Sequence, residues 1–182
     1  MANRLSRFFA ASASAAALCI PASAFAQAAP ASCPMVFDYE TDASGAPIVA
    51  GQDLASAYSA WGADLIVWNT QNMSSQGMGI AFDSGNPTGG DWDLGSPNQA
   101  YGGPGVGGGG TSNSFPLGNL LISAENFVDA NGDGLIDTPD DDANGAWFEY
   151  FFDAPTCIFS MTTVDADYGE TTPDLVAYNA AG

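Results

Sequence analysis

The residues with the clearest chemical potential lie in the segment 129–140, which reads Asp-Ala-Asn-Gly-Asp-Gly-Leu-Ile-Asp-Thr-Pro-Asp. Gly134 is its sixth residue, where a sharp turn requires glycine, and Ile136 supplies an apolar side chain that can hold the loop against its domain. Oxygen ligands are available at positions 1, 3, 5, 9 and 12 from side chains and at position 7 from a carbonyl: Asp129, Asn131, Asp133, Asp137, Asp140 and Leu135. Because Ca²⁺ takes about six to eight oxygens, this spacing predicts a calcium site.

The segment resembles the calcium loops of EF-hands and especially of dockerins, in which an Asp often stands at position 12. Asp140 is shorter than the Glu usual in EF-hands, which implies weaker bidentate binding or help from Asp141 or Asp142. The flanks differ from EF-hand helices, because 120–123 is strand-like and Asn144-Gly145 favours a turn. A partial second loop beginning at Asp140 resembles the chained acidic loops of thrombospondin type 3 repeats and bacterial surface proteins. The alternative interpretation is a solvated acidic turn that binds no metal.

The charge of the chain excludes several classes of partner and mechanism. The 182 residues include 21 Asp and Glu, 2 Lys and Arg and no His, for a formal charge of -19. A chain this acidic is repelled by nucleic acids and anionic membrane surfaces. Without His or Lys, it also lacks the Ser-His-Asp triad, an imidazole zinc site, a lysine Schiff base and a P-loop. Carboxylates are the main reactive groups that remain.

The first 26 residues have the features of a secretory signal peptide. Arg4 and Arg7 precede an apolar stretch over 8–25, and Ala24-Phe25-Ala26 supplies a small-residue cleavage site. No later stretch is apolar for the 18 or so residues that a spanning helix needs. We therefore expect a secreted protein, extracellular or associated with the cell surface, without membrane insertion after cleavage. Loss of both arginines changes the formal charge from -19 to -21.

Removal of the signal peptide leaves two cysteines, Cys33 and Cys157. In an oxidising compartment, these two residues are predicted to form a disulfide. The competing hypothesis is a catalytic thiol, but the chain has no His or Lys to lower the pKa of the cysteine.

The rest of the chain, 27–182, is predicted to be one all-β domain. The proposed architecture is a jelly-roll-like β-sandwich with long Gly-rich and acidic loops, because short apolar runs alternate with turn-forming residues. The segment 53–61 is equally compatible with a short helix, and 102–110 is predicted to be a mobile surface loop. The last residues enter a turn with no returning strand, which is compatible either with a fold that has no final hairpin or with a domain truncated at its C-terminus. The expected strands are 35–39, 65–68, 78–82, 120–123, 146–152, 157–164 and 175–178.

The order of these features resembles exported bacterial β-sandwich domains that occur in surface proteins of the PEP-CTERM kind. The resemblance rests on Phe37-Asp38-Tyr39-Glu40-Thr41-Asp42, Trp61-Gly62, the stretch from Phe82 to Leu94, the calcium loop and the ending from Tyr178. It implies fold and location and no particular activity.

Three functions are compatible with the sequence. The first is a non-catalytic, calcium-binding module with a structural or adhesive role at the cell surface or in extracellular matrix, with polysaccharide or a surface protein as its partner. The second is a calcium-dependent carbohydrate-binding module, in which an exposed aromatic ring stacks on sugars. Trp92 is the best candidate for this contact, ahead of Trp61 and Tyr101, because Asp91 and Asp93 flank it in a turn-rich segment.

The third function is a glycoside hydrolase or lyase that uses paired carboxylates. Glu149 lies among aromatic residues, with Glu125 or Glu170 as its partner. The alternative for Glu149 is an outward-facing residue on an edge strand. The apolar character of 146–152 otherwise predicts a strand buried on both faces. The acidic segment 82–93 is predicted to be a surface turn more readily than a second ion site.

Overall fold

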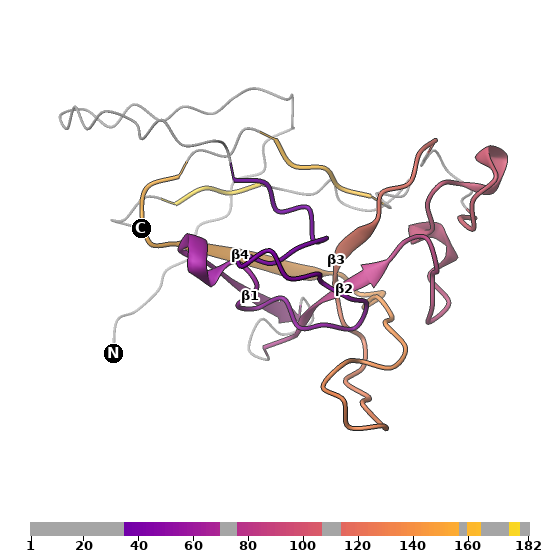
Figure 1. The fold of residues 1–182 in the computed structure, drawn as a ribbon, viewed down its shortest axis with the longest axis horizontal. Helices are drawn as coiled ribbons and strands as arrows, with labels where there is room; N and C mark the ends of the chain where they lie inside the picture. Colours follow the sequence, from indigo (N-terminus) through magenta and orange to yellow (C-terminus); the bar gives the residue numbers. More distant parts are fainter. Residues whose placement is uncertain (1–34, 70–75, 107–113, 157–159, 165–174, 179–182) are drawn as a thin grey trace.

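The computed structural model describes residues 35–69, 76–106, 114–156, 160–164 and 175–178, and its regular structure is mainly strands (Figure 1). The strands are β1 (Ala63–Asn69), β2 (Gly79–Asp83), β3 (Asn119–Ser123) and β4 (Ala146–Phe152). Short 3-10 helices accompany them: η1 (Ser59–Trp61), η2 (Trp92–Leu94) and η3 (Gln99–Tyr101). The all-β class predicted from the sequence therefore agrees with this part of the chain.

The strands form two antiparallel sheets of two strands each within the described residues. In one sheet, Ala63 of β1 lies opposite Phe152 of β4. In the other, Gly79 of β2 lies opposite Ser123 of β3. Four of the predicted strands are confirmed, and their partners lie far apart in the sequence.

Three other predicted strands are wrong over the residues that the structure describes. At 35–39 the chain turns at Tyr39, whose φ of 59° is left-handed. The Tyr39 N–H donates to the hydroxyl of Tyr58 at 3.0 Å, so it is not available to a neighbouring strand. The segments 160–164 and 175–178 are mostly exposed and form no ladder, while 157–159 lies outside the described residues.

Strand β2 links the two halves of the core. Its residues Gly79 to Phe82 are all buried, and their side chains alternate between two hydrophobic clusters. The first cluster joins β2 to the inner face of β1 and contains Ile48, Leu54, Tyr58, Ala63, Leu65, Val67 and Ala81. The second joins β2 to β3 and contains Ile80, Phe82, Leu94, Ile122, Ala124 and Ile136.

Strand β4 differs from its predicted environment. Phe148 and Phe151 are 40% and 44% exposed, and no residue of β4 is fully buried. Only Tyr150, Phe152 and Ala146 pack against the first cluster. The prediction of a strand buried on both faces is therefore wrong: Tyr150 and Phe152 face the core, but Phe148 on the same face and Phe151 on the opposite face are exposed.

Two irregular segments also differ from expectation. In 53–61 only η1 is helical, because the carbonyl of Ala55 accepts a hydrogen bond from Leu65 of β1 at 3.0 Å and is not available for a helix. The Gly-rich segment 102–110 is packed at its start. The N–H of Gly105 donates to the carbonyl of Pro97 at 3.1 Å, and Gly105 forms a β-bridge with Asn98.

The predicted signal peptide 1–26, Cys33 and Cys157 lie outside the described residues. In the part of the chain that the structure describes, no helix has the length and apolar character needed to cross a membrane.

Candidate metal centre

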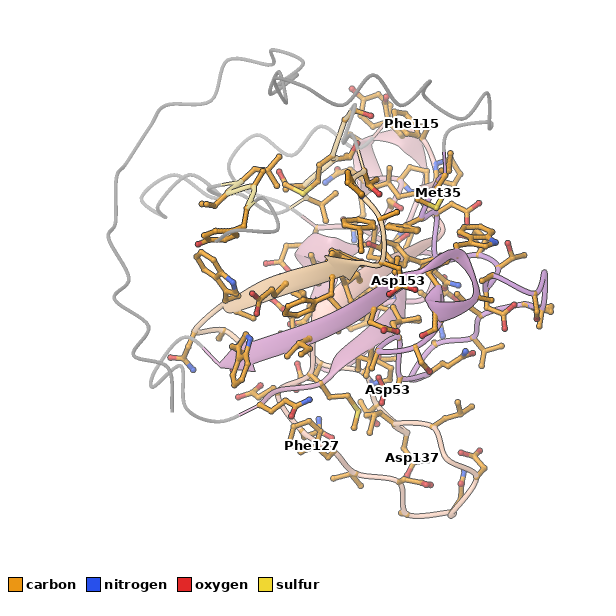
Figure 2. All side chains as sticks on the ribbon, turned by 90° about the vertical axis from the view of Figure 1, so that its left-hand side faces the viewer. Met35, Asp53, Phe115, Phe127, Asp137 and Asp153 are labelled. Atoms are coloured by element: carbon orange, nitrogen blue, oxygen red, sulfur yellow. The ribbon has the colours of Figure 1, made fainter. Side chains whose placement is uncertain are left out.

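The acidic loop 129–140 projects from the end of β3 and returns toward β4, and Figure 2 shows Asp137 within it, away from the strands. Backbone pairing closes its base. Ala124 forms a bridge with Asp141, and the Glu125 N–H donates to the carbonyl of Asp140 at 2.9 Å. The two ends of the loop are therefore held together, and the loop connects β3 of one sheet to β4 of the other.

The loop winds around the carboxylate of Asp129, at its first position. One carboxylate oxygen accepts hydrogen bonds from the N–H groups of Gly132 at 2.7 Å and Asp133 at 3.1 Å. The other oxygen accepts from the N–H of Gly134 at 2.9 Å. Gly134 has a φ of 88°, which a glycine adopts without strain, so the turn at position 6 has the predicted chemistry.

The other acidic side chains of the loop bond to the same turn. Asp133 accepts a hydrogen bond from the N–H of Leu135 at 2.9 Å and another from the side chain of Asn131 at 3.0 Å. Asp137 accepts from the N–H of Ala130 at 2.7 Å. Four predicted ligands, Asp129, Asn131, Asp133 and Asp137, therefore belong to one hydrogen-bonded turn, with Leu135 in the same turn.

Ile136 fixes this turn to the core. Its side chain is 7% exposed and lies in the second hydrophobic cluster. Its N–H donates to the carbonyl of Gly51 at 3.0 Å, and the Gly51 N–H in turn donates to Ala81 of β2 at 2.8 Å. The acidic turn is therefore connected to the most buried strand by two backbone hydrogen bonds and one apolar side chain.

Asp140, the twelfth residue, lies against Asp91 of the second acidic segment. The carboxyl groups of Asp91 and Asp140 share a hydrogen bond, and Asp91 also accepts from the N–H of Asp141 at 2.6 Å. The Thr88 hydroxyl donates to the carbonyl of Pro139 at 2.7 Å. The segment 82–93 thus packs against the end of the loop, a contact that no local spacing in the sequence indicated.

Burial raises the pKa of Asp91 to about 6, and the negative charges of Asp140 and Asp93 contribute in the same direction, whereas the N–H of Asp141 opposes them. Two carboxyl groups this close cannot both ionise freely, so one retains a proton at mildly acidic pH. A cation placed between them would remove that constraint.

The donor set suits a hard cation in its chemistry, although its side chains do not converge on one point. Among the described residues, no three acidic or cysteine side chains are close enough together to hold a metal ion. The Asp129 oxygen that accepts from both Gly132 and Asp133 has no lone pair left. The other Asp129 oxygen and the bonded oxygens of Asp133 and Asp137 each accept one N–H and keep a second lone pair, so the turn retains acceptor capacity. Coordination would require Asp129, Asp133 and Asp137 to turn these lone pairs toward a common centre.

The remaining predicted contacts lie on other elements. Trp92 begins η2 and is 52% exposed, next to the Asp91 carboxyl that contacts Asp140. Glu149 lies on β4, where it accepts a hydrogen bond from the indole of Trp68 at 3.2 Å. Glu125 lies at the base of the loop, and Glu170 is outside the described residues.

The raised pKa of Asp91 predicts a pH dependence of stability in calcium-free buffer. A folded-state pKa above the ordinary value of 3.8 means that protonation of Asp91 stabilises the fold, and this contribution is lost as the pH rises through about 6. Asp91→Asn removes the ionisation and keeps the bond from Asp141. We expect it to raise the free energy of unfolding at pH 7 by about 1 kcal/mol, a value reduced for the partial exposure of the group.

Urea unfolding of wild type and Asp91→Asn between pH 4 and pH 7 measures this difference. The two curves should converge at the acidic end and separate as the pH rises. Asp93→Asn is the control, because it removes a neighbouring charge without removing the raised pKa. If the free energies of unfolding of wild type and Asp91→Asn changed with pH in parallel, the raised pKa would not belong to Asp91.

No protein-family model, curated protein or solved structure gave a significant match to this chain. A functional conclusion therefore rests on the residues themselves.

Proposed function

We propose that this chain is a secreted, non-catalytic module that binds calcium through the loop 129–140 and has a structural or adhesive role at the cell surface or in extracellular matrix. We further propose that its all-β domain is a jelly-roll-like β-sandwich. The observation that carries the calcium proposal is the hydrogen-bonded turn around Asp129, to which the residues of the first, third, fifth and ninth positions belong and which is joined to the core through Ile136.

Electrostatics supports a bound cation. Two carboxylates about 5 Å apart repel by nearly 1 kcal/mol even in water, and the loop contains several such side chains. After removal of the signal peptide the sequence has no Lys, Arg or His to neutralise them. The counter-charge must then come from solution, and Ca²⁺ prefers the oxygens that the loop offers.

The place of Ile136 favours a structural role over a signalling role. Its side chain belongs to the cluster that also contains Phe82 of β2 and Ile122 of β3. A cation that orders the turn would therefore also hold Ile136 in the core. Calcium is expected to act as a structural element of the domain.

Calorimetric titration of Ca²⁺ into the chelator-treated chain tests the proposal. We expect saturable binding, and at least a tenfold weaker affinity for Asp133→Asn. Asp53→Asn is a matched control, because Asp53 accepts a hydrogen bond from Ala55 at 2.8 Å just as Asp133 accepts from Leu135 at 2.9 Å, and both variants keep this acceptor while losing one charge. No saturable heat, or equal loss in the two variants, would reject the site.

A calcium-dependent carbohydrate-binding module that uses Trp92 is the second candidate. The supporting observation is that Trp92 is 52% exposed and adjoins Asp91, which contacts the last residue of the calcium loop. Calcium could in this way influence the position of the indole.

A further inference from the structure

The outer face of the sheet formed by β1 and β4 combines aromatic rings with carboxylates. Inward positions of β1, such as Leu65 and Val67, are buried in the first cluster. Because side chains alternate along a strand, the intervening residues lie on the opposite face. We define this outer face by Asp64, Ile66 and Trp68 of β1 and Trp147, Glu149 and Phe151 of β4.

The strand register places these residues in cross-strand pairs. Trp68 lies opposite Trp147, and Asp64 lies opposite Phe151. The middle pair is Ile66 and Glu149. Each carboxylate therefore has an aromatic residue beside it on the same face, at the short separations typical of cross-strand neighbours.

Hydrogen bonds hold the two carboxylates in place. The indole N–H of Trp68 donates to Glu149 at 3.2 Å, which uses the only donor of that ring and orients the Glu149 carboxylate. The hydroxyl of Ser59 in η1 donates to Asp64. Each carboxylate still has lone pairs for further donors, so the outer face presents fixed acceptors between rings.

The rings offer area for contact with a ligand. Phe151 is 44% exposed, and Trp68, Trp147 and Glu149 are half-buried. Trp147 and Phe151 are four residues apart on one strand, which separates them by about 13 Å. This span is longer than a single sugar ring and suits an extended chain.

From this arrangement we propose that the outer face of β1 and β4 binds a neutral polysaccharide in an extended conformation. The rings of Trp147 and Phe151 stack against the apolar C–H faces of two pyranoses that are not adjacent along the chain, and Glu149 and Asp64 accept hydrogen bonds from sugar hydroxyls. The ligand is uncharged because the two carboxylates would repel an anionic polysaccharide, and the sequence outside the signal peptide has no cationic side chain to hold one.

The same charges argue against a second copy of the chain as the occupant. Two copies joined through this face would bring Glu149 and Asp64 of each copy together without a basic residue to neutralise them. A ligand rich in hydroxyl donors satisfies the carboxylates without adding charge.

The inference deepens the proposed adhesive role and rests on it for the extracellular setting. It does not depend on calcium, because the outer face shares no residue with the loop 129–140. Saccharide binding should persist in chelator at a temperature where the chain remains folded. Loss of calcium binding alone would reject the proposed loop function and leave the outer face unaffected.

Affinity electrophoresis through gels containing hydroxyethyl cellulose, xylan, galactomannan or polygalacturonate tests the outer face. We expect at least one of the three neutral polysaccharides to retard the wild-type chain and polygalacturonate not to do so. Trp147→Ala should weaken the interaction at least tenfold, and Trp147→Phe should recover part of it. Phe151→Ala, at an exposed position, gives a second test if Trp147→Ala does not fold.

Phe115→Ala is the control, since Phe115 is 61% exposed and lies outside this face. Its retardation should equal that of wild type. Loss of binding in Trp92→Ala with normal binding in Trp147→Ala and Phe151→Ala would place the saccharide at Trp92 and overturn the proposal. Absence of retardation by all three neutral polysaccharides, or stronger retardation by polygalacturonate, would also overturn it.

Discussion

Calcium should raise the midpoint of thermal unfolding of residues 27–182 by about 5–10 °C relative to chelator. A ligand at a hundred times its dissociation constant stabilises the folded state by about 2.7 kcal/mol, and in a domain of this size each kcal/mol shifts the midpoint by about 2–4 °C. The loop transmits this stabilisation because Ile136 lies in the same cluster as Phe82 and Ile122. Differential scanning calorimetry in calcium and in EDTA measures the shift.

The matched pair Asp133→Asn and Asp53→Asn isolates the contribution of the loop. Asp133→Asn should lose most of the calcium-dependent shift, because it removes a charged ligand at the fifth position. It should melt no lower than wild type in EDTA, since it also removes repulsion with Asp129 and Asp137. Asp53→Asn should keep the full shift. An unchanged melt of the wild-type chain on adding calcium would refute the proposed role.

Gly51→Ala should lower the free energy of unfolding by about 2–4 kcal/mol, the second large effect that we expect. Gly51 has a φ of 82°, where a side chain is strained, and a Cβ atom there would overlap the backbone of Ile136. Relief of this overlap would break the hydrogen bond from Ile136 to Gly51 and withdraw the Ile136 side chain from the core. Urea denaturation gives the difference in free energy.

Gly45→Ala separates the cost of backbone strain from the cost of steric overlap. Gly45 has nearly the same φ, 83°, and open space around the position of a Cβ atom. Its substitution should cost only the backbone strain, about 1 kcal/mol. If both variants lost the same stability, the close approach of Gly51 to Ile136 would have no measurable energetic role.

The sequence predicted β1, β2, β3 and β4 but overpredicted strands elsewhere. Local apolar runs were sufficient where a partner strand supplies backbone hydrogen bonds, as β3 does for β2. They were insufficient at 35–39, because the Tyr39 N–H bonds to Tyr58 instead of a neighbouring strand. Strand formation depends on partners as well as on propensity.

The environment of β4 also could not be predicted from local sequence alone. Its run of aromatic residues is compatible with a strand buried on both faces, and the structure buries only one face against the core. The alternation that would distinguish the two faces is weak, because apolar residues occupy both. The pairing with β1 shows which residues face outward and places Trp147, Glu149 and Phe151 together.

The sequence by itself determined the turn around Asp129, because its predicted ligands and its glycine lie within one short segment and interact through local hydrogen bonds. It also determined that residues 27–182 contain no basic side chain. Only the tertiary structure decided that Asp140 contacts Asp91, that Ile136 bonds to Gly51, and that Trp68 lies opposite Trp147. These pairs are separated by many residues, so their contact is fixed by the packing of β2 against two clusters and by the register of β1 with β4.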